Sequence, residues 1–195
     1  MYRLPGLERW RGLLALLLLL LGLQQGLAAA LIQAKARLAP LLIEAAWQQS
    51  LLDGGGPVRP WSWADTWPVG RLQVPDLAVD LLVLAGDSGN ALAFGPGLAW
   101  GSPAPGSGGT VVIAAHRDTH FAFLAEIEPG DMLTLVLGDG SSRRYRAEHV
   151  RIVNADNETI PIVGDSDSLL LVTCYPFDAL RAGGPLRYTV QAFPA

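Results

Sequence analysis

The chain has 195 residues, a length that suits one folded domain with a short appendage rather than two large domains. Half of the residues are hydrophobic and only 16% are charged, so part of the apolar surplus is expected to face a membrane. Residues 1–40 hold five basic groups and one acid, which leaves the remainder with a net charge of −8 and argues against nucleic acid or an anionic membrane surface as its partner.

The N-terminal segment is predicted to direct export. Residues 12–23 read GLLALLLLLLGL and follow three arginines, and extension of this run to Ile32 gives about the 20 residues that span a bilayer. The small-residue pattern Ala28-x-Ala30 fits a cleaved signal peptide. The basic start with a longer apolar stretch favours an uncleaved anchor, which we prefer. Under both interpretations residues 1–32 form a signal or anchor segment, and the folded part lies outside the cytoplasm.

A helical stalk is predicted to follow. Residues 33–52 are rich in Ala, Leu, Gln and Glu with apolar residues at helical spacing, which indicates a helix that bends or restarts at Pro40. The glycine-rich stretch 53–57 breaks regular structure. We therefore expect a stalk and linker over 33–57 and a single catalytic or binding domain over 58–195.

Three tryptophans open this domain. Trp61, Trp63 and Trp67 lie in PWSWADTWPV, a segment too short and too irregular for a helix. The simplest interpretation is a strap whose indoles pack onto the domain, and an aromatic lid or interfacial anchor is the alternative.

The rest of the domain has an all-β pattern. Alternating apolar stretches are separated by turn sequences such as GDSGN, EPGD and GDGSS, which is typical of a closed or sandwiched sheet of seven or eight strands. Short helices are expected only near 91–100 and after His120. The predicted strands are Arg71–Val74, Val79–Leu84, Thr110–Ala114, Met132–Leu137, Arg144–Val153, Leu169–Thr173 and Leu186–Ala192.

Three strand ends carry reactive side chains: His116, Cys174 and Arg187. Cys174 is the single cysteine, so an intramolecular disulfide is excluded, and a lone cysteine is ordinarily a small buried residue unless its surroundings differ. Acyl transfer by a thiol needs a nucleophile, a proton donor for the leaving amine and a positive site for the oxyanion. These three residues supply one of each, on a rigid scaffold.

With these residues the sequence resembles the sortase family, whose signature is a histidine after a strand, an L-x-T-C strand end and an arginine on the next strand. Here these are His116, Leu171-Val172-Thr173-Cys174 and Arg187, in the family's order. More narrowly, PWSWADTWPV, LAFGPG, HRDTHFAFL, PGD and TCYPFDALRAGGPLRY look like the Gram-negative sortase class over residues 60–193. Ala115 and Leu170 depart from the family, which often has Gly and Thr there.

The resemblance implies an all-β, eight-stranded sortase-type barrel with short helices, preceded by a membrane helix and stalk. It implies that Cys174 attacks the Thr–Gly carbonyl of an LPxTG-like sorting signal on an exported protein and forms a thioester, which an amine acceptor that the resemblance leaves open then resolves. His116 would be the acid and base, Arg187 would bind substrate or stabilise the oxyanion, and Thr173 would be a hydrogen-bond donor lining the site. The expected location is the inner membrane, single-pass, with the catalytic domain in the periplasm.

Two metal sites are alternatives. His116-x-x-x-His120 has the spacing of two zinc ligands on a helix, but it lacks the glutamate of H-E-x-x-H and a third ligand. A calcium site like that of some sortases would draw on acidic loop residues, which are ordinarily solvated. Neither a metal nor another cofactor is therefore expected. The calcium candidates are Glu126, Glu128, Asp131, Asp156, Asn157 and Glu158.

Two rival functions remain open. Another exported cysteine enzyme is disfavoured by chain order, because the cysteine of papain-like proteases precedes the histidine and the arginine of L,D-transpeptidases follows the cysteine almost directly. The second rival is a non-catalytic, membrane-tethered binding barrel with a buried Cys174. Labelling by a thiol reagent would distinguish this binding barrel from a cysteine enzyme, because only an enzyme needs a reactive thiol.

Overall fold

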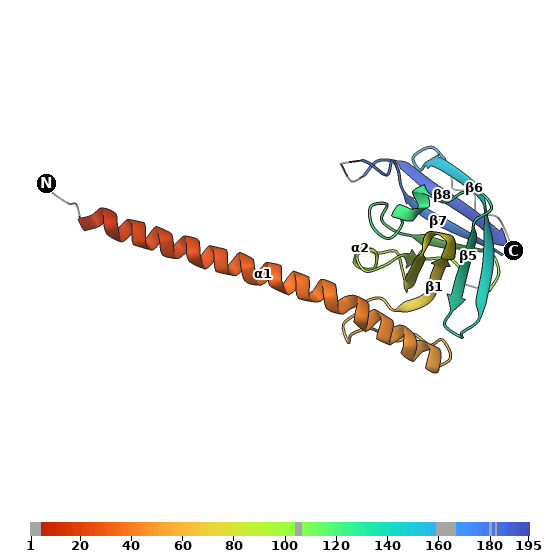
Figure 1. Ribbon diagram of the computed structural model, residues 1–195, viewed down its shortest axis with the longest axis horizontal. Coiled ribbons are helices and arrows are strands. Elements are labelled where there is room, and N and C mark those ends of the chain that lie inside the picture. The colour runs from red at the N-terminus through yellow and green to blue at the C-terminus, as the bar shows by residue number, and fades with distance from the viewer. Residues whose placement is uncertain (1–4, 104–106, 159–166, 180, 182) are drawn as a thin grey trace. The chain divides into compact units, whose positions relative to one another are not determined.

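The computed structural model describes residues 5–103, 107–158, 167–179, 181 and 183–195 (Figure 1). The chain divides into two compact units, Met1–Leu41 and Leu42–Ala195. The first is helical, and the second holds all the strands together with the last turns of the first helix.

Helix α1 spans Pro5–Leu52 and includes both the apolar run and the predicted stalk. It continues through Pro40 without restarting, although proline lacks the N–H that would bond one turn back. The leucines from Leu13 to Leu31 are exposed, and a window of this helix has a mean hydropathy of 2.1. By length and composition α1 is able to cross a membrane. The helix ends where the glycine-rich stretch begins, as predicted.

The second unit is a closed barrel of eight strands in the order β1-β2-β3-β4-β7-β8-β6-β5. This confirms the all-β barrel expected from the sequence. The strands are β1 Pro68–Val74, β2 Val79–Ala85, β3 Gly97–Leu98, β4 Thr110–Ala114, β5 Met132–Leu137, β6 Ser142–Asn154, β7 Ser168–Cys174 and β8 Leu186–Pro194. The short helices are η1 Pro75–Leu77, α2 Gly89–Leu92 and η2 Ala122–Ala125. Strand β3 was not predicted, because two residues cannot show an alternating pattern.

Alternation along β7 defines the inside and the outside of the barrel. Leu169 and Leu171 belong to the apolar core and have no exposed surface. Successive side chains of a strand point to opposite faces, so Leu170, Val172 and Cys174 lie on the outer face. The core itself is filled by the same alternation on the other strands, so the Cys174 side chain lies outside the barrel interior.

The last turns of α1 pack within the barrel unit. Ile43, Ala46 and Trp47 are buried, with Trp47 only 2% exposed. The Ser50 hydroxyl donates to the carbonyl of Gly56 at 2.9 Å, which ties the helix end to the turn that follows it. This helix end is therefore part of the folded domain rather than a free linker.

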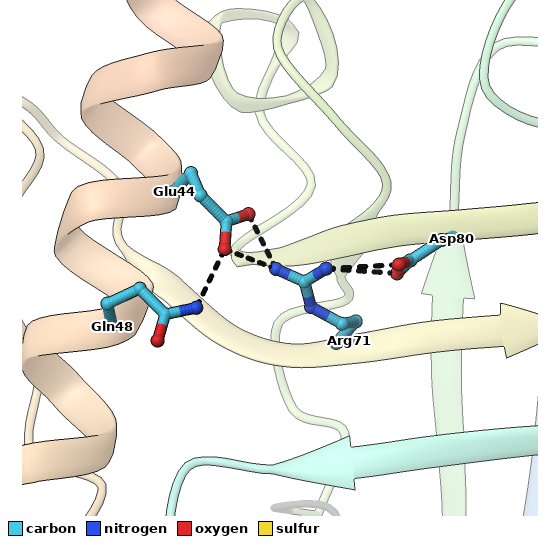
Figure 2. Close-up of polar contacts among 4 residues, drawn as sticks. All are labelled: Glu44, Gln48, Arg71 and Asp80. Atoms are coloured by element: carbon cyan, nitrogen blue, oxygen red, sulfur yellow. Dashed lines mark hydrogen bonds and ion pairs between the residues drawn. The ribbon is translucent and has the colours of Figure 1, made fainter.

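Charged groups reinforce the same packing (Figure 2). The guanidinium of Arg71 on β1 lies between the carboxylates of Glu44 on α1 and Asp80 on β2, with Nη2–Oε1 at 2.6 Å and Nη1–Oδ2 at 3.1 Å. Gln48 donates to the same Glu44 at 2.8 Å. One arginine thus joins the helix and two strands. The cluster Glu44, Arg71 and Asp80 is called the helix dock below.

The tryptophan segment is a strap, as predicted. Trp61 makes an edge contact with Phe94, with ring centroids 5.4 Å apart, and the Thr66 hydroxyl donates to the carbonyl of Ala85 at 2.7 Å. Trp63, by contrast, is 82% exposed. Packing therefore accounts for part of the strap and leaves one indole in solvent.

Candidate active site

The barrel topology brings three strand ends together. Strands β4 and β7 pair in parallel, so their carboxyl ends lie at the same end of the barrel, and β8 begins there because it runs antiparallel to β7. His116 follows β4 by two residues, Cys174 is the last residue of β7, and Arg187 is the second residue of β8. Cys174 and Arg187 are direct partners in the β7–β8 ladder.

Two hydrogen bonds hold the exit of β4 against the end of β7. The N–H of Ala115 donates to the carbonyl of Val172 at 3.2 Å, and the Thr173 hydroxyl donates to the carbonyl of Ala115 at 2.7 Å. The residue ahead of His116 is therefore bonded to the residue ahead of Cys174. Thr173 is 2% exposed and its one hydroxyl proton is committed, so its geometry supports a positioning role rather than the substrate contact expected from the sequence.

The imidazole of His116 is exposed. Among the described residues it has no hydrogen bond or ion pair, so it is accessible to a molecule that enters from solvent. The N–H of Phe121 donates to the His116 carbonyl at 3.0 Å and closes a turn. This turn brings His120 close to His116. Burial, and secondly the positive charge of His116, lower the pKa of His120. The two histidines thus differ: His116 faces solvent, and His120 favours the neutral form.

Cys174 is a free, partly buried thiol on the outer face of β7. Its backbone position is fixed on both sides, because it pairs with Arg187 and the N–H of Tyr175 donates to the carbonyl of Leu186 at 3.0 Å. A cysteine that filled the core would share the inward face of Leu171. Its outward position favours a reactive role over the buried role that lone cysteines ordinarily have.

The guanidinium of Arg187 is anchored by one nitrogen. Nη1 donates to the carbonyls of Gly184 at 2.8 Å and Leu186 at 3.0 Å. No carboxylate pairs with Arg187 within the part of the chain that the structure describes, so its charge is not neutralised there. The remaining N–H groups of the fork have no acceptor among the described residues and keep their capacity to donate.

Aromatic rings line the start of the connection between β7 and β8. Tyr175 stacks on Tyr188 with centroids 6.1 Å apart, and Phe177 meets Tyr188 edge-on at 5.0 Å. Burial, and then the neighbouring Tyr175, raise the pKa of Tyr188. The three rings thus pack against one another beside the segment that follows Cys174.

One buried cation beside the site was not foreseen from the sequence. Arg117 directly follows His116, is 8% exposed, and donates from Nη2 to the carbonyls of Ala179 at 3.0 Å and Arg181 at 2.9 Å. Its Nη1 is buried and has no partner among the described residues. The sequence carries no signal for this burial, because an arginine after a strand ordinarily points into solvent.

The zinc and calcium sites considered from the sequence would each need several ligand side chains close together. Among the described residues, no group of three or more His, Cys, Asp or Glu side chains gathers as a metal site would require. His116 and His120 lie near each other, but no third ligand joins them in that part of the chain. The expected absence of a metal and of another cofactor stays a prediction.

Comparison with known proteins identifies the fold and its relatives. The family model described as "Sortase domain" matches residues 72–195. Sortase D of Bacillus subtilis (strain 168) is 33% identical over 122 residues, which cover 62% of this chain and 61% of that protein. The match therefore spans less than two thirds of that relative.

Solved structures agree with the family match. Sortase A from Corynebacterium diphtheriae superposes with a TM-score of 0.60 at 20% identity, covering 80% of this chain and 84% of that one. A Clostridium perfringens sortase D5 transpeptidase superposes with a TM-score of 0.59 at 17% identity, covering 76% and 88%. At these identities the likeness concerns the fold alone. The three source organisms are Gram-positive, so the comparisons do not support the Gram-negative class, which stays a prediction.

Proposed function

The chain belongs to the sortase family, and from this premise we propose that it is a membrane-tethered cysteine transpeptidase. It would cleave an LPxTG-like sorting signal of an exported protein between Thr and Gly and transfer the acyl group to an amine. The observation that carries the proposal is the direct pairing of Cys174 with Arg187 beside the strand exit that holds His116.

Acylation uses all three side chains. The thiolate of Cys174 attacks the threonine carbonyl carbon, and the carbonyl oxygen becomes an oxyanion next to the free N–H groups of Arg187. The tetrahedral adduct collapses as the C–N bond breaks, and His116 in its protonated form donates a proton to the departing glycine nitrogen. A thioester on Cys174 and a free amine result.

Deacylation reverses the proton transfer. His116, now neutral, accepts a proton from the incoming amine as that amine attacks the thioester carbonyl. Arg187 again faces the oxyanion, and collapse of the adduct releases the Cys174 thiolate. Because two backbone carbonyls already hold Nη1 of Arg187, little reorganisation is needed to present the rest of the fork. Thr173 acts here as a positioning residue that keeps the β4 and β7 ends together.

The proposed location follows from α1. The helix is apolar enough to cross a membrane, and three arginines precede its apolar run, which favours a cytoplasmic N-terminus and a catalytic domain on the opposite side. The Gram-negative class would make this the inner membrane and the periplasm. Protease protection in spheroplasts tests the orientation: external protease should degrade the barrel, and protection of the barrel would contradict it.

Mass spectrometry tests the chemistry. The full chain in detergent is incubated with a synthetic peptide that ends in an LPxTG-type signal, and intact and peptide masses are recorded. We expect an acyl adduct on Cys174 and release of the C-terminal fragment. Cys174→Ala should abolish both, and Arg144→Lys on the exposed face of β6 should change neither. Processed peptide with a Cys174 thiol that is never acylated would contradict the mechanism.

The observation that disfavours the non-catalytic barrel is the position of the thiol. Cys174 is partly accessible on the outer face next to an unneutralised guanidinium, whereas a structural cysteine would be enclosed in the core. Iodoacetamide should therefore label the native chain at Cys174. Labelling that required denaturation would favour the binding barrel.

A further inference from the structure

Arg117 is a buried arginine without a carboxylate partner in the described part of the chain. Arginine is rarely buried unless its charge is paired. Among the described residues, Nη2 of Arg117 donates to two backbone carbonyls, and Nη1 has no acceptor. A buried donor that lacks an acceptor disfavours folding, so stability alone does not explain why an arginine occupies this place.

The acceptors of Arg117 explain its position. Ala179 and Arg181 lie in the connection between β7 and β8, which runs from Cys174 to Arg187, while Arg117 itself adjoins His116. At the far end of the same connection, the carbonyls of Gly184 and Leu186 hold Arg187. One side chain therefore links the backbone of the acid–base residue to the segment that joins the other two.

We propose that Arg117 is a positioning residue that holds the β7–β8 connection against the exit of β4 and thereby fixes Arg187 beside Cys174. The inference rests on the proposed function in one respect, namely that Arg187 acts on the substrate. Its structural part, the hold on the connection, stands on the two carbonyl contacts alone.

The chemistry of the side chain fits this role. Both hydrogens of Nη2 are used, one for each carbonyl, and the guanidinium stays charged when it is buried. The lysine nitrogen ends one bond short of Nη2, and burial makes lysine easier to deprotonate. Methionine fills a similar volume without any donor. Arg117→Lys should therefore hold the connection weakly, and Arg117→Met should not hold it.

Trypsin reports the structural part without any substrate. The Arg181 carbonyl that accepts from Arg117 belongs to the bond that trypsin cleaves, so cleavage requires that this contact opens. We expect the full-length Arg117→Met protein in detergent to be cut after Arg181 about tenfold faster than wild type, with Arg117→Lys in between. Arg144→Met on the exposed face of β6 is the control, with thermal unfolding measured for every variant. An unchanged cleavage rate after Arg181 in a folded Arg117→Met protein would overturn the proposal.

A double-mutant cycle reports the catalytic part. With the LPxTG-type peptide, Arg117→Met should lower kcat by about 10- to 100-fold and leave KM nearly unchanged, because misplacement of Arg187 weakens only the transition state. In the Arg187→Lys background the same change should cost little, since Arg117 would have nothing left to position. Independent, multiplying losses would overturn the link to Arg187. Should wild type fail to process the peptide, the proposed substrate fails, while cleavage after Arg181 still decides whether Arg117 holds the connection.

Discussion

Two regions of the barrel unit use arginine in opposite ways. At the helix dock, Arg71 lies between the carboxylates of Glu44 and Asp80, so its charge is neutralised (Figure 2). At the proposed active site, the acceptors of Arg117 and Arg187 among the described residues are all backbone carbonyls. A carbonyl fixes the direction of a guanidinium without cancelling its charge. The dock is therefore suited to join elements, and the proposed active site to stabilise the oxyanion that would form on the substrate carbonyl.

The difference separates stability from function in the sequence. Several side chains at the end of α1 are buried and those of the dock are paired, so their loss should weaken the fold, while the molecules that stay folded keep their activity. At the proposed active site His116 and Arg187 have no carboxylate partner among the described residues, and their loss should lower turnover while the fold stays intact. Substitutions in each region can break or sharpen this comparison.

The largest effect on stability is expected at Trp47. Trp47→Ala should lower the free energy of unfolding of the barrel unit by about 3–5 kcal/mol, because a fully buried indole leaves a cavity. The matched control is Trp63→Ala, which removes an indole that is 82% exposed and should change stability by less than about 0.5 kcal/mol. Denaturant unfolding followed by tryptophan fluorescence measures both. Equal losses for the two variants would show that the end of α1 does not stabilise the barrel.

A comparable loss, in rate instead of stability, is expected at Arg187. Arg187→Lys should keep the fold and peptide binding but lower kcat by about 10²- to 10³-fold, because lysine lacks the planar fork. Steady-state kinetics with the LPxTG-type peptide measures it, and Arg144→Lys should be nearly silent. If Arg187→Lys kept full activity while Cys174→Ala was inactive, the assignment of Arg187 would be wrong. The oxyanion donors would then have to be backbone N–H groups near Cys174.

A smaller effect is expected at the helix dock. Glu44→Gln removes one of the two charges that face Arg71 and should cost about 0.2–1 kcal/mol, since the carboxylates of Glu44 and Asp80 are about half exposed. The loss should shrink in 1 M salt, where the screening length falls to about 3 Å. Urea unfolding of wild type and variant at low and high salt measures it. A loss that salt does not change would mean that packing, rather than charge, holds the dock.

The sequence was sufficient for seven of the eight strands because these follow from local pattern, and the catalytic roles of His116, Cys174 and Arg187 stay a prediction. Buried strands alternate, and His116, Cys174 and Arg187 stand where alternation stops. Strand β3 was missed because it has two residues. The continuity of α1 through Pro40 was not foreseen, since a proline predicts a break but a long helix tolerates the loss of one hydrogen bond.

Long-range contacts could not be derived from the sequence. The parallel pairing of β4 with β7, which brings His116 to Cys174, depends on the order of strands in the barrel. The burial of Arg117 depends on where the β7–β8 connection folds back, and the inward-facing hydroxyl of Thr173 depends on which strand lies beside it. Each of these contacts joins residues about 60 positions apart, where periodicity carries no information.

The smallest effect concerns His120 and the pH dependence of stability. Its pKa in the folded chain is below the ordinary value of 6.5, because burial and the neighbouring His116 disfavour the charged form. The unfolded chain therefore binds more protons than the folded chain below about pH 6.5, so stability should fall as the pH decreases through this range and level off below the folded pKa. His120→Gln should make unfolding between pH 7 and 5 less dependent on pH, as measured by urea unfolding at each pH. His149→Gln, on the exposed part of β6, is the control. If the stability of His120→Gln fell as steeply with decreasing pH as that of wild type, other groups would set the acid sensitivity of the fold.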